Sequence, residues 1–147
     1  MSESEAALYK PSPAIPVSGD AISLPHVALD TNLLLDMTRL KIDIFTQIKD
    51  LVGPCALVIP IQVKQELQSL SIERGKTGTA ARVALDALPR FGVEIISVTA
   101  ANGDDALRQL ATKGMIVATN DKALRQSLKN APQRAIVVRQ SKYLDWQ

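Results

Sequence analysis

The sequence predicts an α/β fold: a three-layer α/β/α sandwich around a central five-stranded parallel sheet. Between residues 26 and 147, short apolar runs alternate with longer segments of helical periodicity. The runs are continuously apolar and rich in Val and Ile, which is typical of parallel strands covered on both faces. Hydrophobic residues make up 46% of the chain but aromatic residues only 3%. A domain of this length can therefore bury a sizeable core, and that core is aliphatic.

Each strand is expected where an apolar run is bounded by turn or helix signals. Gly53-Pro54 ends the first helical stretch, Pro60 favours the start of the next helix, and Pro89 with Gly92 separates a later helix from the third strand. The expected strands are 27–29, 56–59, 93–98, 115–119 and 135–139. The expected helices are 33–51, 61–70, 80–88, 104–112 and 121–129, with a basic connector at 72–78. This alternation indicates a Rossmann-like parallel sheet with helices on both faces.

The chain divides into two parts. Residues 1–25 contain four of the eight prolines and no apolar periodicity, so we expect a flexible N-terminal tail. Residues 26–147 form one domain. Cys55 is the only cysteine, which excludes an internal disulfide and a cysteine-based zinc cluster. With no secretory signal and no run of ~18 apolar residues, we expect a soluble cytoplasmic protein without membrane contact.

Several carboxylates stand where a parallel sheet would gather them. Asp30 follows the predicted strand 27–29 and Asp121 follows 115–119, so both belong at the carboxyl edge of the sheet, where α/β folds bind ligands. Asp104 and Asp105 open the predicted helix 104–112. A second explanation exists for Asp104 and Asp121, because an aspartate at a helix start also caps free backbone N–H groups.

Glu66 has a different signal. In the predicted helix 61–70 the inward stripe is Val63, Leu67 and Leu70, and Glu66 lies on or beside it. A carboxylate that faces the core needs a partner, because burial of an unpaired charge is costly. That partner is either a bound cation or a Lys or Arg side chain at the edge of the stripe.

The five carboxylates, if they gather, require a cation. Two carboxylates ~4 Å apart repel each other by roughly 4 kcal/mol at an effective dielectric constant of 20. A ligand set made only of oxygen atoms favours Mg²⁺ or Mn²⁺. Without these five residues, the charged side chains of the sequence number 17 basic and 10 acidic. An acidic site in a basic surface suits a polyanion held around a metal ion.

At these residues the sequence resembles the PIN-domain nucleases. The motifs are Asp-Thr-Asn at 30–32, Glu66 in the helix after the second strand, Gly-Asp-Asp at 103–105 and Thr-Asn-Asp at 119–121, and the resemblance covers about residues 26–147. Ala-Thr-Asn-Asp at 118–121 and Arg-Gln-x-Lys-Tyr-Leu at 139–144 are most similar to the archaeal and eukaryotic branch linked to ribosomal RNA processing. That branch also includes archaeal VapC-type toxins of toxin–antitoxin pairs.

The resemblance implies a PIN-like fold and a metal-dependent endoribonuclease, active in rRNA processing or as a toxin-type RNase. The implied catalytic residues are Asp30, Glu66, Asp104 and Asp121. The implied ligands of Mg²⁺ or Mn²⁺ are these four and Asp105, and aligning the apolar positions of the helix favours Asp104 over Asp105. The residues implied to orient the carboxylates and metal-bound water are Thr31, Asn32, Thr119 and Asn120.

Four basic residues are candidates for contact with the RNA backbone: Arg74, Lys76, Lys122 and Arg125. For each of them taken alone, solvated surface is the preferred explanation. The expected partners are RNA, an antitoxin or ribosome-assembly protein, and a second copy of the chain in a homodimer. The alternative function is a catalytically inactive PIN-like scaffold that binds RNA or a protein.

Overall fold

The computed structural model describes residues 24–147, which form a six-stranded sheet flanked by six helices. The predicted tail, except for its last two residues, lies outside the described residues. The strands are β1 (His26–Leu29), β2 (Ala56–Pro60), β3 (Glu94–Ile96), β4 (Ile116–Thr119), β5 (Ile136–Arg139) and β6 (Tyr143–Trp146). The helices are α1 (Thr31–Arg39), α2 (Ile44–Val52), α3 (Ile61–Ser71), α4 (Gly75–Arg90), α5 (Gly103–Thr112) and α6 (Lys122–Ser127).

The sheet confirms the α/β prediction and corrects the number of strands. Its order is β3-β2-β1-β4-β5-β6, and the first five strands are parallel. The sixth strand, which the sequence did not predict, pairs antiparallel to β5 with Val138 opposite Leu144. The turn between these strands places Gln140 and Ser141 at φ 54° and 53°. Because this hairpin turn lacks the Gly or Asn that usually marks a positive φ, its sequence gave no signal.

Two of the predicted helical segments differ clearly from the structure, and the helix predicted at 121–129 ends already at Ser127. The segment 33–51 is two helices, α1 and α2, because the chain turns at Lys41 with φ 56° and restarts after Asp43, whose side chain caps α2. The connector 72–78 is shorter than expected, because α4 already begins at Gly75. Gly78 permits this start: a Cβ at this position would lie 1.8 Å from the carbonyl oxygen of Glu73.

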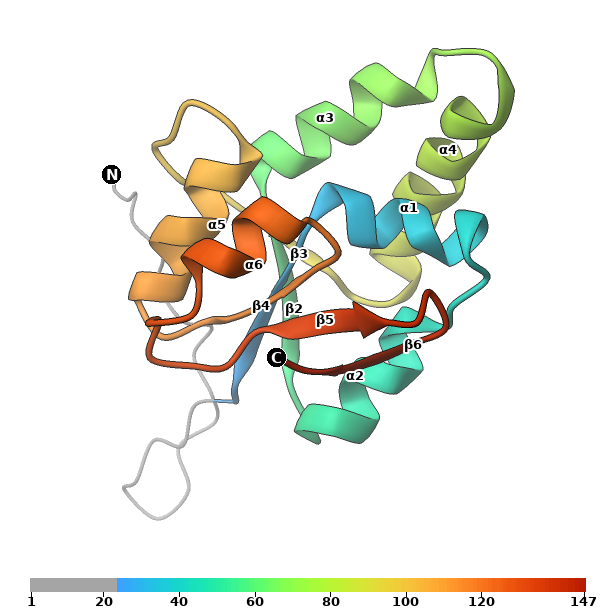
Figure 1. Ribbon diagram of the computed structural model, residues 1–147. Coiled ribbons are helices and arrows are strands. Elements are labelled where there is room, and N and C mark those ends of the chain that lie inside the picture. The colour runs from blue at the N-terminus through green and yellow to red at the C-terminus, as the bar shows by residue number, and fades with distance from the viewer. Residues whose placement is uncertain (1–23) are drawn as a thin grey trace.

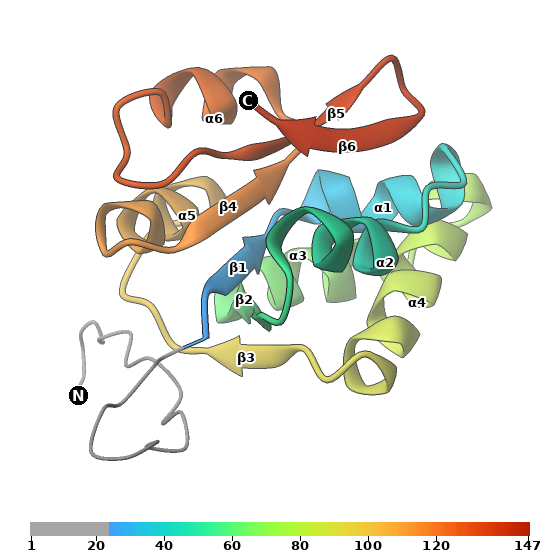
Figure 2. The ribbon, with the colours of Figure 1, turned by 90° about the horizontal axis from the view of Figure 1, so that it is seen from below.

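The helices cover both faces of the sheet, with α5 and α6 on one face and α1, α2 and α4 on the other (Figures 1 and 2). The central strand β1 is therefore buried on both faces, and its apolar residues Val27, Ala28 and Leu29 have no exposed surface. No helix within residues 24–147 has the length and hydrophobicity needed to span a lipid bilayer.

The sheet order creates a topological switch point. From β1 the chain first builds β2 and β3 on one side and then returns to build β4 and β5 on the other. In open α/β sheets, the crevice outside the carboxyl ends of two such strands is the usual ligand site. Here the two strands are β1 and β4. Asp30 follows β1 directly, and Asp121 follows β4 after Asn120.

Candidate functional site

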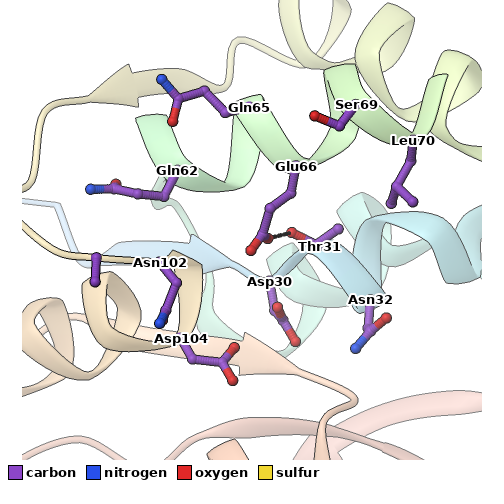
Figure 3. A pocket seen from close by; sticks show the side chains of 11 residues that line it. Asp30, Thr31, Asn32, Gln62, Gln65, Glu66, Ser69, Leu70, Asn102 and Asp104 are labelled. Carbon is purple, nitrogen blue, oxygen red and sulfur yellow. Dashed lines mark hydrogen bonds between the residues drawn. The ribbon is translucent and has the colours of Figure 1, made fainter. Parts of the chain in front are cut away.

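A cavity of about 510 Å³ opens at this switch point, between α3, α5 and the start of α1 (Figure 3). Three of the predicted carboxylates, Asp30, Glu66 and Asp104, contribute to its lining. They come from three segments that are far apart in the sequence, so the fold brings them together. The remaining lining side chains within residues 24–147 are uncharged.

Asp30 is the buried member of the group. Its backbone N–H donates to Ala118 O over 3.0 Å and thereby extends the pairing of β1 with β4. Its Oδ2 accepts a hydrogen bond of 2.6 Å from Thr119 Oγ1, and the same Oγ1 accepts the backbone N–H of Asp121 over 2.9 Å. Burial raises the pKa of Asp30 from 3.8 to about 6; the bond from Thr119 works against this rise, and the charges of Asp104 and Asp121 add to it.

Glu66 lies beside the inward stripe of α3 and extends into the open cavity. Val63 and Leu67 of the stripe are fully buried, whereas Glu66 is exposed. Its Oε1 accepts a hydrogen bond of 2.5 Å from Thr31 Oγ1, so the partner that the structure gives this carboxylate is a hydroxyl group (Figure 3). Gly103 packs against the same carboxylate, and a Cβ there would lie 2.9 Å from Glu66 Oε1. The glycine therefore allows α5 to approach α3 this closely.

The two adjacent aspartates of α5 have different surroundings. Asn102 caps the helix, because its side chain accepts the backbone N–H of Asp105 over 2.9 Å, so the capping explanation for Asp104 is wrong. Asp104 lines the cavity, and burial, followed by the charge of Asp121, raises its pKa. Asp105 instead forms an ion pair of 2.9 Å with Arg108. The structure thus separates the pair, with Asp104 at the cavity and Asp105 held by Arg108.

Asp121 caps a helix and also contributes to the electrostatics of the cavity. Its Oδ1 accepts the backbone N–H of Leu124 over 2.8 Å, as the capping explanation predicts. It is not among the residues that line the cavity. Its negative charge nevertheless raises the pKa of both Asp30 and Asp104, which places all three carboxylates within electrostatic reach of one another.

One buried carboxylate near this site was not predicted. Asp36 accepts a hydrogen bond of 2.7 Å from Asn120 Nδ2 and forms an ion pair of 3.0 Å with Arg39. Arg39 also donates to the carbonyl oxygen of Asn32, a residue of the cavity wall. The sequence did hold a signal for Asp36, because it directly follows the buried run 33–35. Like Glu66, Asp36 is a carboxylate beside apolar residues of a predicted helix, which is the criterion that singled out Glu66.

The four predicted basic residues lie outside the cavity lining. Arg74 and Lys76 are exposed at the turn between α3 and α4, which projects away from the sheet (Figure 1). Lys122 and Arg125 belong to α6, the helix that begins directly after Asp121. The fold therefore places only the second pair next to the acidic residues.

The donor chemistry of the site fits a hard divalent cation. All of its candidate ligands are carboxylate oxygens, and their mutual repulsion and burial are unfavourable without a positive charge. As these side chains stand, no three carboxylate, histidine or cysteine groups within residues 24–147 converge closely enough to enclose an ion. The Glu66 carboxylate is bonded to Thr31, and the Asp121 carboxylate caps α6. These two side chains would therefore have to rotate before all the carboxylates could bind one ion.

We expect the free energy of unfolding of the wild-type protein, relative to that of Asp30→Asn, to fall as the pH rises from about 4 to 7 in EDTA. Because the pKa of Asp30 is raised from 3.8 to about 6, the folded state binds a proton more tightly than the unfolded state, and this stabilisation is lost as the pH passes 6. The expected change is roughly 3 kcal/mol, or about 1.4 kcal/mol for each pKa unit. Denaturant unfolding of both proteins across this range measures it, and parallel profiles would contradict the shift.

Known proteins are similar to the chain over these same elements. A family model described as a PIN like domain matches residues 27–141. Ribonuclease VapC9 of Archaeoglobus fulgidus is 38% identical over 112 residues, which cover 75% of this chain and 78% of that protein. Ribonuclease VapC4 of Methanocaldococcus jannaschii is 32% identical over 122 residues, which cover 79% of this chain and 92% of that protein.

A solved structure agrees with the fold. The structure of the PIN domain endonuclease Utp24 superposes with a TM-score of 0.69 at 26% sequence identity, and the match covers 83% of this chain and 90% of that chain. The family model spans every strand from β1 to β5 and all six helices. On this match and on its relatives, the chain belongs to the PIN-like domain family.

Proposed function

We propose that this protein is a Mg²⁺- or Mn²⁺-dependent endoribonuclease. The observation that carries the proposal is the cavity at the switch point, where Asp30, Glu66 and Asp104 meet and Asp121 acts on two of them through its charge. The relatives named as ribonucleases, at 38% and 32% identity, support RNA as the substrate class. An rRNA-processing enzyme and a toxin-type RNase differ in the RNA that they cut, and one site of this kind serves either role.

The four carboxylates would hold the metal, which supplies a bound water of lowered pKa and positive charge opposite the phosphodiester. Asp105 is the weaker candidate ligand, because its carboxylate is already paired with Arg108. Thr119 orients Asp30 by donating to its Oδ2, and Thr31 orients Glu66 in the same way. Such hydrogen bonds hold ligands in place and are typically worth ~10- to 100-fold in metal affinity or activity.

The proposal is tested with the purified protein and a structured RNA in the presence of Mn²⁺, Mg²⁺ or EDTA. Cleavage that requires the metal and disappears in Asp30→Asn supports it. The alternative, a scaffold that binds without cutting, predicts that calorimetry detects Mn²⁺ binding while no RNA is cleaved. Since a nuclease and a non-cleaving scaffold would both bind a cation, RNA cleavage is the measurement that distinguishes the two functions.

We expect Lys122→Ala with Arg125→Ala to weaken RNA binding and to reduce its salt dependence. Both residues follow Asp121 on α6 and so lie beside the acidic site. Each lost phosphate contact lowers the slope of log K against log salt by about 0.7 for single-stranded RNA. The matched pair Arg74→Ala with Lys76→Ala, on the distant α3–α4 turn, is expected to change the slope less. Fluorescence anisotropy in EDTA measures both pairs, and an unchanged slope for the α6 pair would remove α6 from the RNA path.

A further inference from the structure

The cavity extends well beyond its carboxylates. Its volume of about 510 Å³ is in the range of small-molecule sites, ~300–1,000 Å³, whereas a water molecule needs only ~10–15 Å³ of such space. On the side away from Asp30 its wall is formed by the polar face of α3 and by the loop before α5 (Figure 3). We call this part the amide wall and define it by its residues: Gln65, Ser69, Leu70 and Asn102.

The amide wall presents hydrogen-bonding groups that are not used within the described protein. The structure gives the side chains of Gln65 and Ser69 no hydrogen-bond partner in residues 24–147, although Ser71 on the same helix donates to Gln68 O over 2.7 Å. Asn102 uses its Oδ1 to cap α5, which leaves its side-chain NH₂ group available. The Gln65 amide and the Ser69 hydroxyl can therefore each donate and accept a hydrogen bond at the cavity, and the Asn102 NH₂ group can donate one.

The wall is held in a fixed position by Gln62. Its Nε2 donates to Val98 O over 2.6 Å and to Ala100 O over 3.0 Å, which fastens the loop that carries Asn102 to α3. The Oε1 of the same side chain is the buried side-chain polar atom that lacks a partner in the described part of the chain. Such atoms are rare and call for an explanation. This atom belongs to a residue that lines the cavity.

The chemistry of the wall selects the class of ligand. Among residues 24–147 no Lys or Arg lines the cavity, and three carboxylates do, with Glu66 projecting from α3 between Gln65 and Ser69, so the amide wall does not suit a phosphate group. No aromatic side chain of the described residues lines it either, so they provide no stacking platform. Amide groups match the donor and acceptor pattern of a base edge, a hydroxyl can pair with the ribose 2′-OH, and Leu70 offers an apolar surface to the base.

We propose that the amide wall binds the nucleoside next to the phosphodiester that is cut and sets the base preferred at that position. The proposal rests on the proposed ribonuclease function. The phosphate lies at the carboxylate end of the cavity and the base lies along α3. Recognition by neutral hydrogen bonds makes the preference moderate, because each such bond is typically worth about 2- to 10-fold in discrimination.

Helix α3 offers a matched control for the test. Gln65 and Gln68 are both exposed on this helix, three residues apart, but only Gln65 lines the cavity. With RNA randomised around the cleavage site, Gln65→Ala and Ser69→Ala are each expected to reduce the base preference next to the cut by about 2- to 10-fold. Gln68→Ala should keep the wild-type preference. If all three variants keep it while wild-type protein still cleaves, the amide wall is not the base site and the ribonuclease proposal stands.

A binding measurement separates the two proposals when no RNA is cut. In Mg²⁺, the side-chain NH₂ resonances of Gln65 and Asn102 are followed by NMR during titration with each of the four ribonucleoside 5′-monophosphates. These resonances are expected to shift, with one base giving the highest affinity, while Gln68 does not respond. Shifts without RNA cleavage would support the base site and contradict the nuclease. No shift, or the same shift with inorganic phosphate alone, would overturn the base site.

Discussion

Asp30→Asn is expected to abolish metal-dependent RNA cleavage. Asp30 lies at the end of the central strand with Glu66 and Asp104 beside it in the cavity. The substitution therefore removes a negative charge at the place where the cation would bind. Replacing groups that merely orient metal ligands costs ~10- to 100-fold, and loss of a charged ligand is expected to exceed the upper value. Rates of RNA cleavage in Mn²⁺ and Mg²⁺ measure the loss.

The same variant is expected to fold at least as stably as the wild type. Asparagine keeps the volume of the side chain and an oxygen that accepts the bond from Thr119. It also removes a buried charge whose pKa of about 6 shows that ionisation is unfavourable there, so at pH 7 in EDTA we expect a gain of roughly 3 kcal/mol. Asp86→Asn, on the exposed face of α4, is the matched control and should change neither property. Cleavage by Asp30→Asn at the full rate would reject this site.

Asp36→Ala is expected to lower both stability and cleavage. The buried Asp36 carboxylate joins α1 to the turn that follows β4 by accepting from Asn120, and Arg39 of the same helix pairs with this carboxylate. Hydrogen bonds to charged groups are worth about 1.5–3 kcal/mol, so unfolding in denaturant should show a loss of that size. Because the same turn positions Thr119 and Asp121, we expect cleavage to fall by about 10- to 100-fold.

A double-mutant cycle shows whether Asp36 acts through the turn. If it does, Asn120→Ala and Asp36→Ala have overlapping effects on the cleavage rate, and the double variant is little worse than Asp36→Ala alone. The concentration of Mn²⁺ at half-maximal activity should also rise, which loss of global stability alone does not predict. Effects that add without overlap would assign Asp36 a purely structural role.

The sequence was sufficient to predict the positions of Asp30 and Asp121 because both follow buried apolar strands, and parallel strands that are separated by helices present their carboxyl ends at one edge. Glu66 was found because a carboxylate beside an apolar helical stripe is unusual. The sequence was not sufficient for β6 or for the break at Lys41, where positive φ angles occur without glycine. Tertiary pairing and packing stabilise these conformations, and local propensity does not indicate them.

The parallel α/β core and the chain positions of the carboxylates can be predicted from the sequence, since both follow from apolar periodicity and from the residues that end each strand. Which carboxylate enters the cavity and which is held elsewhere depends instead on contacts between elements that are distant in the sequence. Asp104 and Asp105 are neighbours in the sequence, yet the cap formed by Asn102 and the ion pair with Arg108 direct them differently. The bond from Thr119 to Asp30 and the contact of Gly103 with Glu66 likewise join residues far apart in the chain, and such contacts exist only once the elements have packed.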